Sequence, residues 1–168
     1  MYDFKTDPGA PKAVLYDDLI LAAKALVADE ADAVANMANV AALLWQFLPD
    51  VNWTGFYRMV DGDGEDGGGG ELVLGPFVGK PACIRIPVGQ GVCGAAAESR
   101  ATQLVADVHA FPGHIACDGE TKSELVVPVI RDGAVVAVID LDSPNEARFD
   151  EEDRAGIERL AEALVDAI

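Results

Sequence analysis

The chain has 168 residues, of which 51% are hydrophobic, and a formal net charge of −17 at pH 7. This length suits one domain with a full hydrophobic core, so we expect residues 1–168 to form a single domain. The negative charge opposes binding to phosphate backbones, so nucleic acid is not an expected partner. No apolar run approaches the roughly 20 residues that span a bilayer, and the N-terminus lacks the pattern of a signal peptide. We therefore expect a cytoplasmic protein that does not bind membranes.

Hydrophobic periodicity predicts the elements of the first half of the chain. Two helices and then three strands are expected, at residues 11–29, 32–48, 51–60, 71–77 and 82–86. The acidic, glycine-rich stretch between the first two strands, residues 61–70, predicts a loop that ends a hairpin. Within VNWTGFYRMV, Trp53 and Tyr57 share one face because strand side chains alternate with a period of two.

The second half begins with a helix at residues 89–99 and a short strand at 102–107. Residues 124–130 and 134–142 flank an Asp-Gly pair, which is a strong hairpin signal. The C-terminal segment predicts a helix with Asp150 as its N-cap. Parallel βαβ repeats are absent from this pattern, so we predict an α+β domain with an antiparallel sheet. The N- and C-terminal helices should pack on one face of that sheet.

Three carboxylates should meet at one end of the predicted hairpin. Asp140 and Asp142 share a strand face because they lie two residues apart, and hairpin pairing brings Glu124 close to both. A solvated strand end would explain these acids without any function. Alternatively, they bind a cationic group, or one of them has a raised pKa and donates a proton. Trp53 and Tyr57 likewise fit either core packing or an aromatic wall for a small ligand.

The remaining chemistry lies in three cysteines, Cys83, Cys93 and Cys117, and two histidines, His109 and His114. An odd number of cysteines excludes a fully paired disulfide framework within one chain. The spacing of these residues matches no C-x-x-C or H-x-x-x-H pair, so we expect no metal site. Cys117 lies in a loop bounded by glycine and proline, where functional residues tend to occur. Cys83 is expected within the strand at 82–86, and Cys93 fits a buried, inert cysteine best.

The sequence closely resembles the free methionine-(R)-sulfoxide reductases, which are small GAF-domain enzymes. The resemblance extends from about residue 16 to residue 164 and keeps the motifs in order. Its motifs are NWTGFY, LVLGPFVGKPACIRIPVGQGVCG, VADVHAFPGHIACD, SELVVPV, IDLDSP and RFDEEDRAGIERL. The resemblance implies a GAF-like six-stranded antiparallel sheet with flanking helices, in agreement with the pattern above.

The resemblance also implies the activity: reduction of free L-methionine (R)-sulfoxide, an oxidative-stress repair reaction, with thioredoxin as external reductant and no bound cofactor. It implies that Cys117 attacks the substrate and that Cys83 resolves the product as a Cys83–Cys117 disulfide. Cys93 matches a third cysteine that can join a disulfide. The other site residues that it implies are the substrate-binding acids and aromatics Glu124, Asp140, Asp142, Trp53 and Tyr57.

As a mechanism, we expect Cys117 to become a sulfenic acid while Asp142 or Glu124 protonates the sulfoxide oxygen. One electrostatic problem accompanies this expectation, since acids at positions 118, 120 and 124 should disfavour a thiolate at Cys117. Two alternatives stay open: a non-catalytic GAF-type sensor of a small molecule or redox state, and a zinc-stabilised interaction module. The sequence does not determine the oligomeric state and leaves a homodimer open.

Overall fold

The computed structural model of the chain describes residue 4 and residues 9–60, 70–115 and 118–168. In these residues the helices are α1 (Lys12–Val27), α2 (Ala33–Phe47), α3 (Gly91–Ser99) and α4 (Glu151–Leu164), with a short 3₁₀ helix η1 (Val108–Ala110). The strands are β1 (Trp53–Val60), β2 (Glu71–Gly79), β3 (Arg85–Pro87), β4 (Gln103–Val105), β5 (Ser123–Arg131) and β6 (Ala134–Ser143). No helix in the described ranges is long and apolar enough to cross a bilayer.

The strands form one six-stranded sheet in the order β3-β2-β1-β6-β5-β4, and every neighbouring pair is antiparallel. The hairpin between β5 and β6 closes where Arg131 pairs with Ala134. Its two turn residues, Asp132 (φ 51°) and Gly133 (φ 79°), both adopt positive φ, as the predicted Asp-Gly turn requires. The predicted α+β fold with an antiparallel sheet is therefore confirmed.

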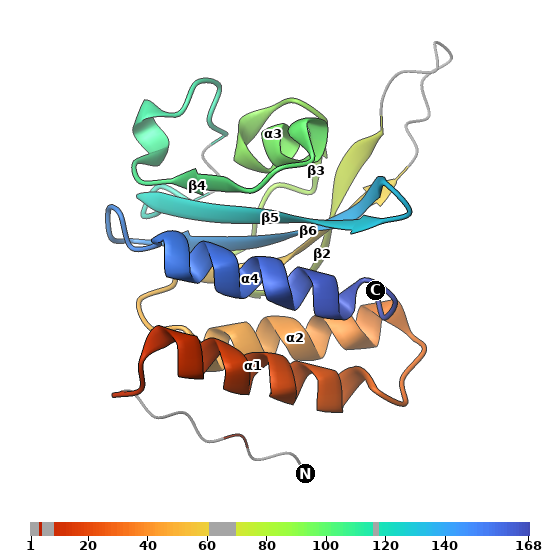
Figure 1. Cartoon of the computed structure of the whole chain (residues 1–168). Helices are drawn as coiled ribbons and strands as arrows, with labels where there is room; N and C mark the ends of the chain where they lie inside the picture. Colours follow the sequence, from red (N-terminus) through yellow and green to blue (C-terminus); the bar gives the residue numbers. More distant parts are fainter. Residues whose placement is uncertain (1–3, 5–8, 61–69, 116–117) are drawn as a thin grey trace.

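Helices cover the two faces of the sheet unequally (Figure 1). On one face, α2 packs against β1 and β2 while α4 packs against β5, and α1 packs across both helices as an outer layer. The N- and C-terminal helices thus lie on the same side, as predicted. On the other face lies α3, which packs against β5 and β6, and η1 follows the edge strand β4. Side chains of β1 alternate between these faces: Phe56 belongs to the core under α2, and Tyr57 to the cluster under α3.

The contact between α1 and α4 depends on a glycine and on a buried carboxylate. A Cβ at Gly156 would lie 2.3 Å from the ring of Tyr16, so only glycine lets the two helices approach this closely. Asp150 caps α4 and completes a capping box with Asp153. Asp153 also accepts a hydrogen bond of 2.7 Å from the Tyr16 hydroxyl. The predicted N-cap is therefore confirmed, and it belongs to a larger junction between the terminal helices.

The prediction of a strand at residues 82–86 is wrong for its first half. Strand β3 begins only at Arg85, and Cys83 lies in an irregular segment before it. Pro81 offers no backbone donor at this point, and the Cys83 carbonyl accepts a hydrogen bond of 3.0 Å from the Tyr57 hydroxyl instead of joining a strand ladder. The strand predicted at 102–107 is likewise shorter and spans Gln103–Val105.

Candidate active site

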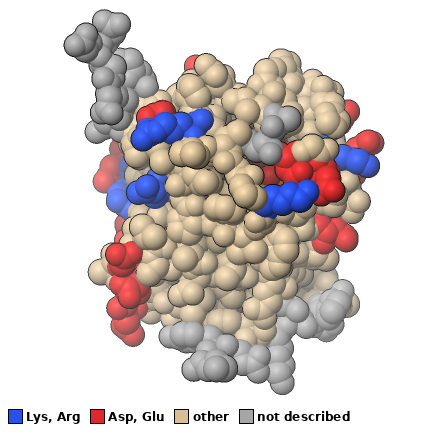
Figure 2. All heavy atoms as spheres, turned by 180° about the vertical axis from the view of Figure 1, so that it is seen from behind, with Lys and Arg blue, Asp and Glu red and all other residues tan. Residues whose placement is uncertain are grey.

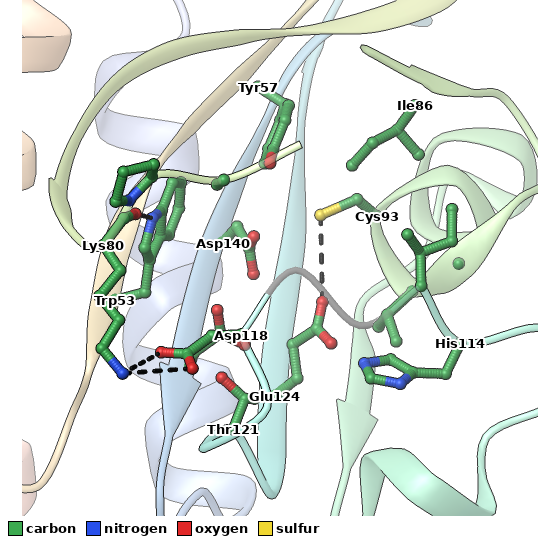
Figure 3. A pocket seen from close by; sticks show the side chains of 16 residues that line it. Trp53, Tyr57, Lys80, Ile86, Cys93, His114, Asp118, Thr121, Glu124 and Asp140 are labelled. Atoms are coloured by element: carbon green, nitrogen blue, oxygen red, sulfur yellow. Dashed lines mark hydrogen bonds and ion pairs between the residues drawn. The ribbon is translucent and has the colours of Figure 1, made fainter. Parts of the chain in front are cut away.

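A pocket lies on the α3 side of the sheet, between β1, the start of α3 and the segment after residue 117 (Figure 3). Its lining combines aromatic, acidic and sulfur-bearing side chains from elements far apart in the sequence. The lining residues are Trp53, Tyr57, Lys80, Pro81, Ala82, Ile86, Gly91, Val92, Cys93, His114, Ile115, Asp118, Thr121, Glu124, Asp140 and Asp142. Seen from behind, acidic side chains and a basic one gather in the upper half of the molecule, on this side of the sheet (Figure 2).

Two aromatic side chains of β1 form one wall of the pocket. The rings of Trp53 and Tyr57 stack with centroids 5.9 Å apart, and Trp53 stacks on Phe77 at 5.2 Å. Both polar ends are held as well: the Trp53 Nε1 donates to the Lys80 carbonyl at 3.1 Å, and the Tyr57 hydroxyl donates to Cys83. Gly55 makes the stacking possible, because a Cβ there would lie 2.7 Å from the Trp53 ring. The wall is therefore fixed before any ligand binds.

The three predicted carboxylates face this wall from the adjacent strands. Glu124 pairs with Asp142 in the β5–β6 register, and Asp140 lies two residues along the same face. Glu124 and Asp140 are buried, and the Cys93 Sγ lies 4.0 Å from the Glu124 Oε1. The Asp140 Oδ1 is buried without a hydrogen-bond partner. The hairpin register thus brings together the acids that the sequence pattern predicted.

Burial raises the pKa values of all three acids. The pKa of Asp140 rises to about 7, although polar contact with Cys93 and Glu124 lowers it. Burial, together with the charge of Asp140, raises the pKa values of Glu124 and Asp142 well above the usual range. In the described part of the chain, no ion pair joins any of these acids to a cation. The cluster therefore keeps protons at neutral pH and can donate one.

Lys80 connects the segment before Cys83 to the segment after residue 117. Its Nζ lies 3.3 Å from the Asp118 Oδ2 and also pairs with Glu120. Asn52 supports the same segment, because its Nδ2 donates to the Thr121 hydroxyl at 3.2 Å. We call the ion pairs of Lys80 with Asp118 and Glu120 the Lys80 clasp. The clasp places one positive charge against two of the acids that the sequence placed near Cys117, and so offsets part of their negative charge.

The three cysteines have different positions. Cys93 is a free thiol buried in the first turn of α3, and it lines the pocket. Burial and the nearby acids raise its pKa well above the usual value, which keeps the thiol protonated. Cys83 is bonded in a disulfide, and Cys117 lies outside the described residues. The structure therefore describes the surroundings of two predicted redox residues and not those of the third.

Sequence reasoning did not identify several residues that line the pocket. Lys80, His114, Asp118 and Thr121 were not among the predicted site residues. The pKa of His114 is lowered by burial and by the charge of His109. The sequence signal that could have pointed to Lys80 is its place three residues before Cys83, within the stretch LGPFVGKPACIRI.

Comparisons with known proteins agree with this geometry. Residues 30–168 match the GAF domain model. The free methionine-R-sulfoxide reductase of Escherichia coli is 44% identical over 91% of this chain and 88% of its own length. That of Saccharomyces cerevisiae is 43% identical over 91% of this chain and 85% of its own.

A solved structure extends the similarity to three dimensions. The free methionine-R-sulfoxide reductase of Neisseria meningitidis, in complex with its substrate, is 43% identical and superposes with a TM-score of 0.89. The match covers 98% of this chain and 94% of that one. Sequence, fold and site geometry thus point the same way, and the chain belongs to the GAF-domain family of free methionine-R-sulfoxide reductases.

Proposed function

We propose that this protein reduces free L-methionine (R)-sulfoxide to L-methionine, using Cys117 and Cys83 as its redox pair and thioredoxin as external reductant. The observation that carries the proposal is the cluster of buried acids opposite the Trp53–Tyr57 wall, which no ion pair among the described residues joins to a cation. A free amino acid supplies an ammonium group for such acids and an apolar side chain for such a wall. The relative from Neisseria meningitidis, solved with its substrate, supports this assignment.

In the first step the Cys117 sulfur attacks the sulfoxide sulfur while Glu124 or Asp142 protonates the sulfoxide oxygen. The oxygen passes to Cys117 as a sulfenic acid, and methionine leaves with its sulfur reduced by two electrons. The raised pKa values of Glu124 and Asp142 support this role, because a carboxyl that is protonated at neutral pH can act as the acid.

The Lys80 clasp answers the electrostatic objection to a reactive Cys117. Asp118 and Glu120 are paired with Lys80, and a protonated Glu124 carries no charge. The acids around residue 117 therefore oppose a thiolate less than the sequence suggests. The substrate ammonium would reduce the remaining negative charge of the pocket further, which ties reactivity to a free amine.

In the second step the Cys83 thiol condenses with the Cys117 sulfenic acid, so that a disulfide forms and water leaves. The disulfide at Cys83 and the free thiol of Cys93 support this pairing, as does the bond from Tyr57 that ties Cys83 to the pocket wall. Thioredoxin, a dithiol, then restores both thiols by exchange through a mixed disulfide. We propose further that residues 1–168 form one catalytic domain and that the protein works in the reducing cytoplasm.

A thiol count tests the proposal. The reduced protein is incubated with free methionine (R)-sulfoxide, with the (S) form, or with a sulfoxide-containing peptide, and its remaining thiols are titrated. The free (R) form alone should remove two thiols per chain. Cys117→Ser should abolish turnover, whereas Cys83→Ser should allow one turnover and block recycling. An unchanged thiol count with every substrate would overturn the proposed reaction.

A further inference from the structure

Three side chains in the pocket form a compact set of potential metal ligands. They are Cys93 from α3, Glu124 from β5 and Asp140 from β6, and all three are buried. One donor atom from each lies within 4.8 Å of the other two. Figure 3 shows the Cys93 sulfur and the two carboxyl groups pointing toward one another across the pocket. Because a helix and two paired strands hold them, their arrangement is fixed by the fold.

A second observation indicates that this set lacks a ligand. Asp140 is only 6% exposed, yet its Oδ1 has no hydrogen-bond partner. Leaving a buried polar oxygen without a partner costs about 1–3 kcal/mol. A cation bound among the three donors would satisfy this oxygen directly.

We propose that Cys93, Glu124 and Asp140 form a binding site for a soft divalent cation of the Zn²⁺ and Cd²⁺ class. A cation at the centre of donors that are at most 4.8 Å apart lies within about 2.8 Å of each of them. Zinc bonds are about 2.0–2.3 Å long, so side-chain shifts of about 0.5–0.8 Å complete the coordination. Asp142 lines the same pocket and offers a fourth oxygen, as does water.

The donor set selects against hard cations. Mg²⁺ and Ca²⁺ take six or more oxygen ligands, whereas this set offers one sulfur and two carboxylates. A thiolate favours Zn²⁺ and Cd²⁺, which displace the thiol proton when they bind. The spacing of cysteines and histidines in the sequence predicted no metal site. Such spacing does not reveal a site in which one cysteine is joined by carboxylates from a hairpin.

The proposed cation occupies the place that the proposed function gives to the substrate ammonium. A metal-loaded pocket would then lack its amine-binding acids. The metal site itself rests on geometry alone and does not depend on turnover, so a failure of one proposal is distinct from a failure of the other.

The disulfide state of the protein provides the test. In that state Cys93 is the free thiol of the described chain, so a Cd–thiolate charge-transfer band in the ultraviolet reports on it. Cd²⁺ is titrated into the oxidised protein in excess Mg²⁺, which saturates the exposed carboxylates without competing for sulfur. Calorimetry gives the stoichiometry, and Zn²⁺ is added afterwards to displace Cd²⁺.

We expect one Cd²⁺ per chain, a charge-transfer band, and loss of that band on adding Zn²⁺. Cys93→Ser should remove the band, and Asp140→Asn should keep it while weakening affinity at least tenfold. Asp118→Asn is the matched control, because Asp118 lines the pocket but pairs with Lys80, and it should change affinity less than threefold. The absence of a band from the folded wild-type protein, or an equal band in Cys93→Ser, would overturn the site.

Discussion

Two groups of buried acids, on opposite sides of the sheet, show how the same side chain can serve stability or chemistry. On the α4 side of the sheet, Asp153 is 1% exposed and is surrounded by Tyr16, Lys12 and Arg148. On the α3 side, Glu124 and Asp140 are also buried, but no ion pair of the described chain reaches them. A buried acid with ion-pair partners joins elements of the fold, whereas a buried acid without them can bind a proton or a cation.

The largest expected effect is the loss of stability when the paired acid, Asp153, is removed. Asp153→Ala leaves Arg148, which is 11% exposed, and the Tyr16 hydroxyl without their partner. Breaking such a buried pair costs about 3–5 kcal/mol, so the midpoint of urea unfolding should fall strongly while the folded fraction keeps its activity. The control is Asp17→Ala, which removes an exposed ion pair between the same two helices and should cost less than about 1 kcal/mol. Equal losses in the two variants would contradict the comparison.

The second effect is the loss of turnover when an acid without an ion pair, Glu124, is replaced. Glu124→Gln should lower turnover of the free sulfoxide about 100-fold or more, because the pocket loses a proton donor. At pH 8 the same variant should be about 1–3 kcal/mol more stable than the wild type, because the amide is neutral in both states, whereas burial disfavours the ionised form of Glu124 that the unfolded chain adopts freely. Kinetics and urea unfolding on one preparation test both statements. A variant that is both slow and unstable would show that Glu124 is a structural residue like Asp153.

The sequence predicted that the three pocket acids lie together, but it did not predict the Lys80 ion pairs beside them. Glu124, Asp140 and Asp142 meet because of two local rules, the period of two in a strand and the turn formed by Asp132 and Gly133. No local rule joins Lys80 to an acid that follows it by 38 or 40 residues.

The misplaced strand around Cys83 has the same origin. Alternating apolar residues predicted a strand there, but a hydrogen bond from Tyr57, 26 residues earlier, holds the Cys83 carbonyl outside the ladder. The helix caps, the hairpin and the side-chain faces follow from neighbours in sequence. The clasp and the Cys83 segment follow from contacts between distant loops, which a single sequence does not encode in any local pattern.

The third effect concerns pH. The folded-state pKa of Asp140 is raised to about 7, while the unfolded value is about 3.9. Between these values the folded state holds a proton that the unfolded chain has lost, so stability falls with rising pH, by up to about 1.4 kcal/mol per unit. The contribution is fully present below about pH 4 and is lost as the pH passes 7. Wild type minus Asp140→Asn should therefore show a falling difference in unfolding free energy from pH 5 to 7, and a flat difference would contradict the raised pKa.

Asp150, which pairs with Lys12 next to Asp153, should show the opposite dependence of stability on pH. Hydrogen bonding from Lys12 lowers the pKa of Asp150 to about 2. Its contribution is present above the unfolded value of about 3.9 and is lost as the pH falls through 2. Asp150 is half-exposed, so the effect is small.

The smallest expected effect concerns the Lys80 clasp. Its acids are paired, as Asp153 is, but Lys80 and Glu120 are exposed and only Asp118 is partly buried. Lys80→Met releases Asp118 and Glu120, and with them the contact between the segment before Cys83 and the segment after residue 117. Since exposed ion pairs contribute little, reduction of the disulfide state by dithiothreitol should accelerate only about two- to fivefold.

Arg85→Met is the matched control for this variant. Arg85 is 57% exposed against 56% for Lys80, and it pairs with Glu71 on the neighbouring strand. Raising the salt concentration should bring the wild-type rate toward that of Lys80→Met, because salt screens exposed pairs, and should leave the variant unchanged. If Lys80→Met and Arg85→Met reduce at the same rate, the clasp is an ordinary surface ion pair. Another factor would then have to explain how the thiol of residue 117 reacts beside these acids.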